Sequence, residues 1–165
     1  MPDYLARIKE IIEEHRTIGS GVKLVGDSVS DQEALASLKS VRSDWVPDRL
    51  DLMSEKQRKL KQTMNFLEEG LRNHFSKEED VLPPLLGEFL TRSLLLEHQE
   101  IIGKIDEIRL VATDSKLDGL SEAELESLDA EAKQKIGDFS RLIEEHAEKE
   151  EIMLDMVARA LKAGK

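Results

Sequence analysis

The residues of this sequence with the clearest potential for chemistry are its four histidines. They are His15, His74, His98 and His146. Two of them are followed four residues later by a glutamate, which gives the pairs His74/Glu78 and His146/Glu150. Residues four apart on an α-helix lie one turn apart on one face, so each pair can direct an imidazole and a carboxylate to the same point. Nitrogen and oxygen donors of these two kinds together bind divalent transition metals.

The segments that carry these residues have the pattern of amphipathic helices. Apolar residues recur every three or four positions around each histidine, and no convincing run alternates with the period of two that marks a strand. We expect four helices, which span about residues 2–29, 44–82, 88–112 and 121–160. Residues 30–45 are expected to form a short helix or a loop insertion between the first two, and they contain Trp45, which we expect to pack.

Local signals mark the ends of these helices. Pro83 and Pro84 should stop the second helix, because proline lacks the N–H donor and its ring clashes with the preceding turn. Ser121 and Glu124 match a capping box at the start of the fourth helix. With short connections between the helices, the sequence predicts an all-α, up-and-down antiparallel four-helix bundle that forms a single domain over residues 1–165. A coiled coil shares the periodicity, but the proline pair and the loops favour a closed bundle.

The heights of the histidines along such a bundle leave one question open. His74 lies 9 residues before the connection at residues 83–87 and His98 lies 11 residues after it, so these two reach similar heights. His98 lies 14 residues before the expected end of the third helix, whereas His146 lies 25 residues after the start of the fourth. Either the third helix continues toward Leu117, or the fourth helix overhangs the bundle.

Histidines and glutamates on these apolar faces would be buried together in the core. A buried carboxylate is costly unless it meets a partner or a cation, and ligands that converge from the helices of a bundle are what a metal site in its core requires. A single histidine on an apolar face is usually a hydrogen-bonded core residue. Four histidines on four helices, two of them with a glutamate, favour a metal site. The alternative is a helical interaction module that binds no metal.

Two phrases of the sequence occur twice. The repeated phrases are Glu14-His15-x-x-Ile18 with Glu97-His98-x-x-Ile101, and His74-x-x-Lys77-Glu78-Glu79 with His146-x-x-Lys149-Glu150-Glu151. This recurrence indicates a duplicated helix pair. A duplicated pair predicts a centre with a pseudo-twofold axis and two metals, in which each copy supplies one half of the ligands.

The composition excludes several kinds of protein. The net charge is −11, and an acidic surface argues against nucleic acid as a partner, because phosphate backbones bind clustered Lys and Arg. No apolar stretch approaches the ~18 residues of a membrane span, and no basic-then-apolar export signal opens the chain. We therefore expect a cytoplasmic protein with no membrane partner. The chain has no cysteine, so nitrogen and oxygen must hold any metal.

The order His … His-x-x-x-Glu … His … His-x-x-x-Glu resembles the hemerythrin-like HHE cation-binding family. The phrases NHFSKEEDVLPPL, LLLEHQEI and EEHAEKEEIML are also typical of that family. The resemblance implies an up-and-down four-helix bundle that holds a non-haem di-iron centre. It further implies the following roles. His15 and His74 would bind one iron, His98 and His146 would bind the other, and Glu78 and Glu150 would bridge them beside an oxo or hydroxo group.

The sequence departs from hemerythrins at two positions. Hemerythrins have a fifth histidine one turn after the histidine of the third helix, and Ile102 stands there in this chain. Their last carboxylate comes five residues after the final histidine. Here Glu150 at a spacing of four lies on the core stripe, and Glu151 at five is the weaker candidate, because it points ~140° away. Glu151 and Glu79 are either solvated or accept hydrogen bonds from ring N–H groups.

Four histidines, rather than five, leave room for an open position on both metals. This set is similar to the four-histidine branch that includes iron-centre repair and nitric-oxide-responsive proteins. We therefore expect a cytoplasmic di-iron protein that binds O₂ or a related diatomic such as NO, as a carrier, a sensor or a redox enzyme. The alternative is an iron store, or an iron donor for damaged iron centres. Zinc or manganese could occupy the same nitrogen and oxygen ligands.

Overall fold

A computed structural model of the chain describes residues 3–40, 49–114 and 116–164. Three long α-helices make up most of these residues, and no strand occurs among them. The helices are α1 (Tyr4–Ser40), α2 (Arg49–Ile108) and α3 (Glu122–Ala163). The expected all-α fold is confirmed. In the described ranges, no helix has an apolar stretch that could cross a lipid bilayer.

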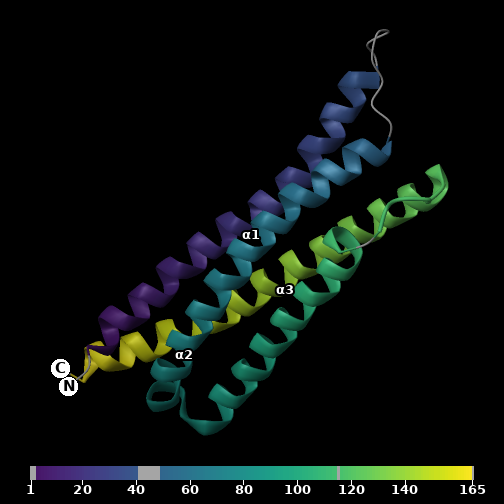
Figure 1. Ribbon diagram of the computed structural model, residues 1–165. Helices are drawn as coiled ribbons and strands as arrows, with labels where there is room; N and C mark the ends of the chain where they lie inside the picture. Colours follow the sequence, from purple (N-terminus) through teal and green to yellow (C-terminus); the bar gives the residue numbers. More distant parts are fainter. Residues whose placement is uncertain (1–2, 41–48, 115, 165) are drawn as a thin grey trace.

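Helix α2 reverses direction at Gly87 and so provides two of the four segments of the bundle. Gly87 has a φ of 80°, which is in the left-handed region that glycine adopts without a steric penalty. The first arm of α2 (residues 49–86) runs beside α1, and the second arm (residues 88–108) runs beside α3 (Figure 1). The two chain ends lie together at one end of the bundle (Figure 1). This is the up-and-down arrangement that the periodicity predicted.

The prediction that Pro83 and Pro84 end the second helix is wrong. The backbone stays helical through both prolines, and the turn comes at Gly87. Proline has a helical φ of its own, and the two carbonyls that lose a donor belong to residues 79 and 80, which are exposed and can bond water instead. The prolines are therefore tolerated in the last turn of the first arm.

Helix α1 is longer than its periodicity predicted. It continues past the expected end near Val29 to Ser40, so residues 30–40 extend the first helix rather than form a separate element. Residues 31–40 are rich in Glu, Ala, Leu and Lys, which have high helix propensity. The remainder of the predicted insertion, with Trp45 and the expected start of the second helix, lies outside the described residues.

The overhang of the fourth helix explains why His146 lies further from the start of its helix than His98 lies from the end of the third. After α2 the chain makes one π-helical turn (Arg109–Thr113), and α3 begins beyond that turn (Figure 1). Ser121 caps α3 as predicted, because its side chain accepts a hydrogen bond of 3.1 Å from the backbone N–H of Glu124. Leu117 and Leu125 are buried together where the connection lies against the first turns of α3.

The apolar core consists of two main clusters, and each histidine lies near the boundary between them along its segment. On α1, for example, His15 lies between Ile11 of the smaller cluster and Ile18 of the larger one. On the second arm of α2, His98 separates Leu94 from Ile101 in the same way. A polar layer therefore crosses the bundle, and apolar packing on both sides holds it away from water.

Substitution of Gly87 by alanine is expected to destabilise the fold by about 1 kcal/mol, because an L-residue in the left-handed region costs ~1–2 kcal/mol. The matched control is Gly70→Ala. Gly70 lies inside a helix with open space around its Cβ position, so alanine there should stabilise by ~0.5–1 kcal/mol. Urea unfolding of the two variants measures both effects. Equal stability of Gly87→Ala and the parent chain would contradict the left-handed turn.

Candidate metal centre

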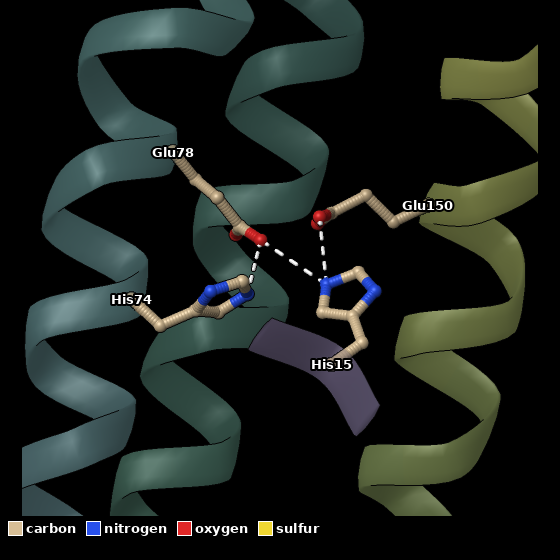
Figure 2. A group of neighbouring side chains, drawn as sticks. All are labelled: His15, His74, Glu78 and Glu150. Atoms are coloured by element: carbon tan, nitrogen blue, oxygen red, sulfur yellow. Dashed lines mark hydrogen bonds and ion pairs between the residues drawn. The ribbon is translucent and has the colours of Figure 1, made fainter. Parts of the chain in front are cut away.

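The polar layer brings together all six residues that the sequence predicted as metal ligands. One comes from α1, two from the first arm of α2, one from the second arm and two from α3. They are His15, His74, Glu78, His98, His146 and Glu150. Each is at most 9% exposed, and both glutamates are completely buried. Figure 2 shows four of these side chains facing one another from three helices.

The carboxylate of Glu78 divides its two oxygens between different imidazoles. Its Oε1 lies 3.3 Å from Nε2 of His15 and also contacts Nε2 of His74 (Figure 2). Its Oε2 lies 2.9 Å from Nε2 of His98. Glu78 therefore joins the imidazoles of the first half of the chain to one imidazole of the second half.

The carboxylate of Glu150 does the same from the opposite helix. Its Oε1 lies 3.2 Å from Nε2 of His15 (Figure 2). Its Oε2 lies 3.2 Å from Nε2 of His146 and 3.8 Å from Nε2 of His98. Each of the two carboxylates therefore faces imidazoles from both halves of the chain.

The six residues form two overlapping groups that could each hold a cation. In each group one ligand atom from every residue lies within 4.8 Å of the others. The groups are His15, His74, Glu78 and Glu150, and Glu78, His98, His146 and Glu150. In the second group the two Nε2 atoms lie 3.1 Å apart. Two nitrogens bound at a right angle to one ion by bonds of ~2.1 Å would lie about 3.0 Å apart.

The hydrogen bonding of these buried atoms also fits a cation. Nε2 of His74, Oε2 of Glu78 and both carboxylate oxygens of Glu150 are close to other polar atoms but have no hydrogen bond of acceptable geometry. A buried polar atom without a hydrogen bond costs ~1–3 kcal/mol, and more when it is charged. A metal ion removes this cost, because it binds lone pairs from several directions at once. The residues present therefore fit a pair of divalent cations.

The electrostatics of the metal-free centre favour protonated imidazoles. Burial opposes the positive charge, but the carboxylates of Glu150 and Glu78 outweigh it and raise the pKa of His15 to about 10 and that of His98 to about 9. Burial likewise opposes the negative charge of Glu150, yet the neighbouring imidazoles, led by that of His146, lower the pKa of this carboxyl well below its usual range. Without metal, protons balance the two carboxylates.

An outer carboxylate holds His74 from the side that faces away from the centre. Nδ1 of His74 lies 2.7 Å from Oε2 of Glu14, and Lys77 donates to the other oxygen of Glu14 at 2.5 Å. A carboxylate only accepts, so Nδ1 is the donor in this contact, and Nε2 is the nitrogen that faces the centre. Burial opposes the charge of Glu14, but Lys77 and then His74 prevail and lower its pKa.

The same arrangement recurs at His146. Its Nδ1 donates to Oε2 of Glu97 at 3.0 Å, and Lys149 donates to Oε1 of that carboxylate. These outer glutamates and lysines were not predicted as part of the site. Their signal was the internal repeat itself, since Glu14 and Glu97 occupy equivalent positions in it, as do the two lysines.

Glu151 has an outer role as well. It is partly exposed, and its Oε1 lies 3.2 Å from Nδ1 of His15, whereas Glu150 faces the centre. Of the possibilities left open for Glu151, its position matches acceptance from a ring N–H. Glu79, the equivalent residue of the other half, is exposed, and Nδ1 of His98 has no hydrogen-bond partner among the described residues.

Replacement of Glu14 by alanine is expected to weaken metal binding by ~10–100-fold, because Nδ1 of His74 loses the acceptor that orients the ring. Competition with a chelator of known affinity measures the change. The control is Glu13→Ala, which removes the neighbouring exposed carboxylate and should leave the affinity unchanged. Equal affinities for the two variants would contradict an orienting role for Glu14.

Comparison with known proteins agrees with this geometry. The family described as "Hemerythrin HHE cation binding domain" matches residues 6–157 of the chain. The searches of curated proteins and of solved structures found no match. The family match covers more than nine-tenths of the sequence and confirms the resemblance seen in its motifs. The chain belongs to the hemerythrin HHE cation-binding domain family.

Proposed function

We propose that this chain holds two iron ions in the polar layer and binds O₂ or NO there, as a carrier, a sensor or a redox enzyme. Membership of a cation-binding family supports a bound metal. The two overlapping ligand groups support a pair of metals. Nitrogen and oxygen donors without thiolate suit iron, and manganese or zinc would use the same residues.

The proposed roles follow the two ligand groups. His15 and His74 would hold one ion, His98 and His146 would hold the other, and Glu78 and Glu150 would be shared between them. Ferrous ions held by these residues would supply electrons to a small ligand bound beside them. The outer carboxylates would keep the imidazoles in the tautomer that presents Nε2, and the apolar clusters on both sides would exclude bulk water.

The observation that carries the choice of a diatomic ligand is a small cavity against the centre. It has a volume of about 20 Å³, and its lining is almost entirely apolar. The lining residues are His15, Ile18, Leu71, His74, Phe75, Ile101, Ile143, His146 and Ala147. A space of ~10–15 Å³ is the least that admits a water-sized particle. The cavity therefore suits a diatomic molecule and is too small for an organic substrate.

The test is to load the protein with ferrous iron without air and then to add O₂ or NO while the visible absorption spectrum is recorded. We expect a spectrum that changes on addition of the gas, with both irons still bound. No spectral change, together with rapid loss of iron to a chelator, would overturn the proposal in favour of an iron store or donor.

A cavity-filling variant sharpens this test. Ala147→Val adds two methyl groups to the lining of the cavity and should weaken binding of the gas while the metal content stays the same. Ala130→Val adds the same groups on the exposed side of α3 and serves as the control. Equal gas binding by the two variants would contradict the cavity as the ligand site.

A further inference from the structure

Three of the four imidazoles have an outer carboxylate at Nδ1, as the internal repeat predicts, and the fourth does not. In the internal repeat, His98 is equivalent to His15, and Glu79 is equivalent to Glu151. The repeat therefore predicts that Glu79 contacts His98 in the way that Glu151 contacts His15. Glu151 lies 3.2 Å from Nδ1 of His15, but Glu79 is exposed, and Nδ1 of His98 is buried with no partner in the described part of the chain. Among the described residues, His98 is thus the one imidazole of the centre that no carboxylate holds from outside.

A pocket of about 470 Å³ lies beside this imidazole, between the two arms of α2. It is lined by Arg72, Phe75, Ser76, Glu79, Leu95, His98, Gln99, Ile102, Gly103 and Asp106. The pocket therefore reaches from solvent-facing carboxylates to a ligand of the centre. This pocket does not include His15, His74 or His146, which line the cavity of about 20 Å³ instead.

The residues around His98 leave its ring less firmly held than the other three. Phe75 stacks on it, with ring centroids 3.9 Å apart and planes within 7°, which fixes the plane of the ring but provides no charge-assisted bond. Ile102, one turn further along the helix, has no donor or acceptor to offer. Loss of an outer partner of a metal-bound histidine weakens metal binding by ~10–100-fold in other sites.

We propose that the two metal positions are unequal, and that the ion bound by His98 and His146 is the one that exchanges with solution, through the pocket beside His98. The carboxylates of Glu79 and Asp106 outnumber Arg72, the one arginine or lysine side chain of that lining, and so favour a cation on its way to the centre. The ion bound by His15 and His74 is retained, since outer carboxylates hold both imidazoles. This inference rests on the proposed pair of metals.

The test uses Co²⁺ as the probe, because its absorption in the visible range reports its ligands. Protein loaded with two Co²⁺ per chain is mixed with an excess of a chelator, and loss of the absorption is followed in time. We expect two phases, one fast and one slow. Gly103→Leu should slow the fast phase alone, because a side chain at Gly103 enters open space in the pocket. Gly70→Leu, a helical glycine with equally open surroundings, is the control.

A second variant acts on the other position. Glu151→Ala removes the outer acceptor of His15 and should accelerate the slow phase by ~10–100-fold while the fast phase is unchanged. Glu79→Ala, at the equivalent repeat position, should leave the slow phase as it is. Two ions that leave in a single phase, or a fast phase that Gly103→Leu does not slow, would overturn the exchange route and leave the proposed function intact. A chain that binds fewer than two Co²⁺ would overturn both.

Discussion

Substitution of Glu78 by glutamine is expected to abolish the paired metal centre while the bundle stays folded. Glu78 gives one oxygen to each ligand group, so a single neutral side chain weakens both positions at once. The loss of affinity should exceed the ~10–100-fold expected for an outer partner, because a shared anionic ligand is removed. Metal analysis of the purified variant should find one ion or fewer per chain.

The control for this prediction is Glu69→Gln, which neutralises an exposed carboxylate on the same arm of α2. It should retain the metal content of the parent chain. Circular dichroism of both variants checks that the helices remain. If Glu78→Gln kept two ions with unchanged affinity, Glu78 would not be shared between the two positions.

The second large effect expected is a dependence of the metal affinity on pH. The pKa values of about 10 for His15 and about 9 for His98 lie above the ordinary value of ~6.5, so both imidazoles carry a proton at pH 7.5 in the metal-free protein. A metal binds only the deprotonated nitrogen, so loading must release both protons. The combined affinity for two ions should therefore rise about a hundredfold per pH unit from about pH 7 to pH 9, and level off above pH 10.

Isothermal titration calorimetry in buffers with different enthalpies of ionisation counts the protons released. About two protons per loaded chain at pH 7.5 is the expected count. A count near zero would show that the imidazoles are neutral before metal binds, which contradicts the ion pairs with Glu78 and Glu150.

The stability of the metal-free protein provides a second check, because it should fall as the pH rises, whereas the metal affinity should increase. A pKa that is raised on folding gives stability that is complete below the unfolded-state value of ~6.5 and is lost as the pH rises through the folded-state values of about 9 and 10. Urea unfolding of the metal-free protein should therefore give a lower free energy of unfolding at pH 10 than at pH 7. Metal-loaded protein should lack this loss, because its imidazoles are already neutral when metal is bound and have no positive charge to lose as the pH rises.

Much of the fold could be read from the sequence, because helical periodicity is a local property. The spacing of apolar residues placed each histidine and Glu78 on the buried side of its own helix, and burial in the structure agrees. The ends of the helices were harder to predict. The prolines at 83 and 84 are the stronger signal by residue type, but the turn occurs at Gly87, since only the positive φ of a glycine reverses the chain there.

The sequence by itself determined the chemistry of the layer: which donors are available, that thiolates are excluded, and that the donors lie on apolar faces where a carboxylate needs a counter-charge. Only the tertiary structure decided the contacts between helices. Glu14 and Glu97 hold imidazoles of other segments, whereas Glu79 lies exposed, and Nδ1 of His98 has no hydrogen-bond partner among the described residues. Such contacts depend on the rotation and height of one helix relative to another. The side chains of the whole core set these two quantities together, so the periodicity of a single helix does not contain them.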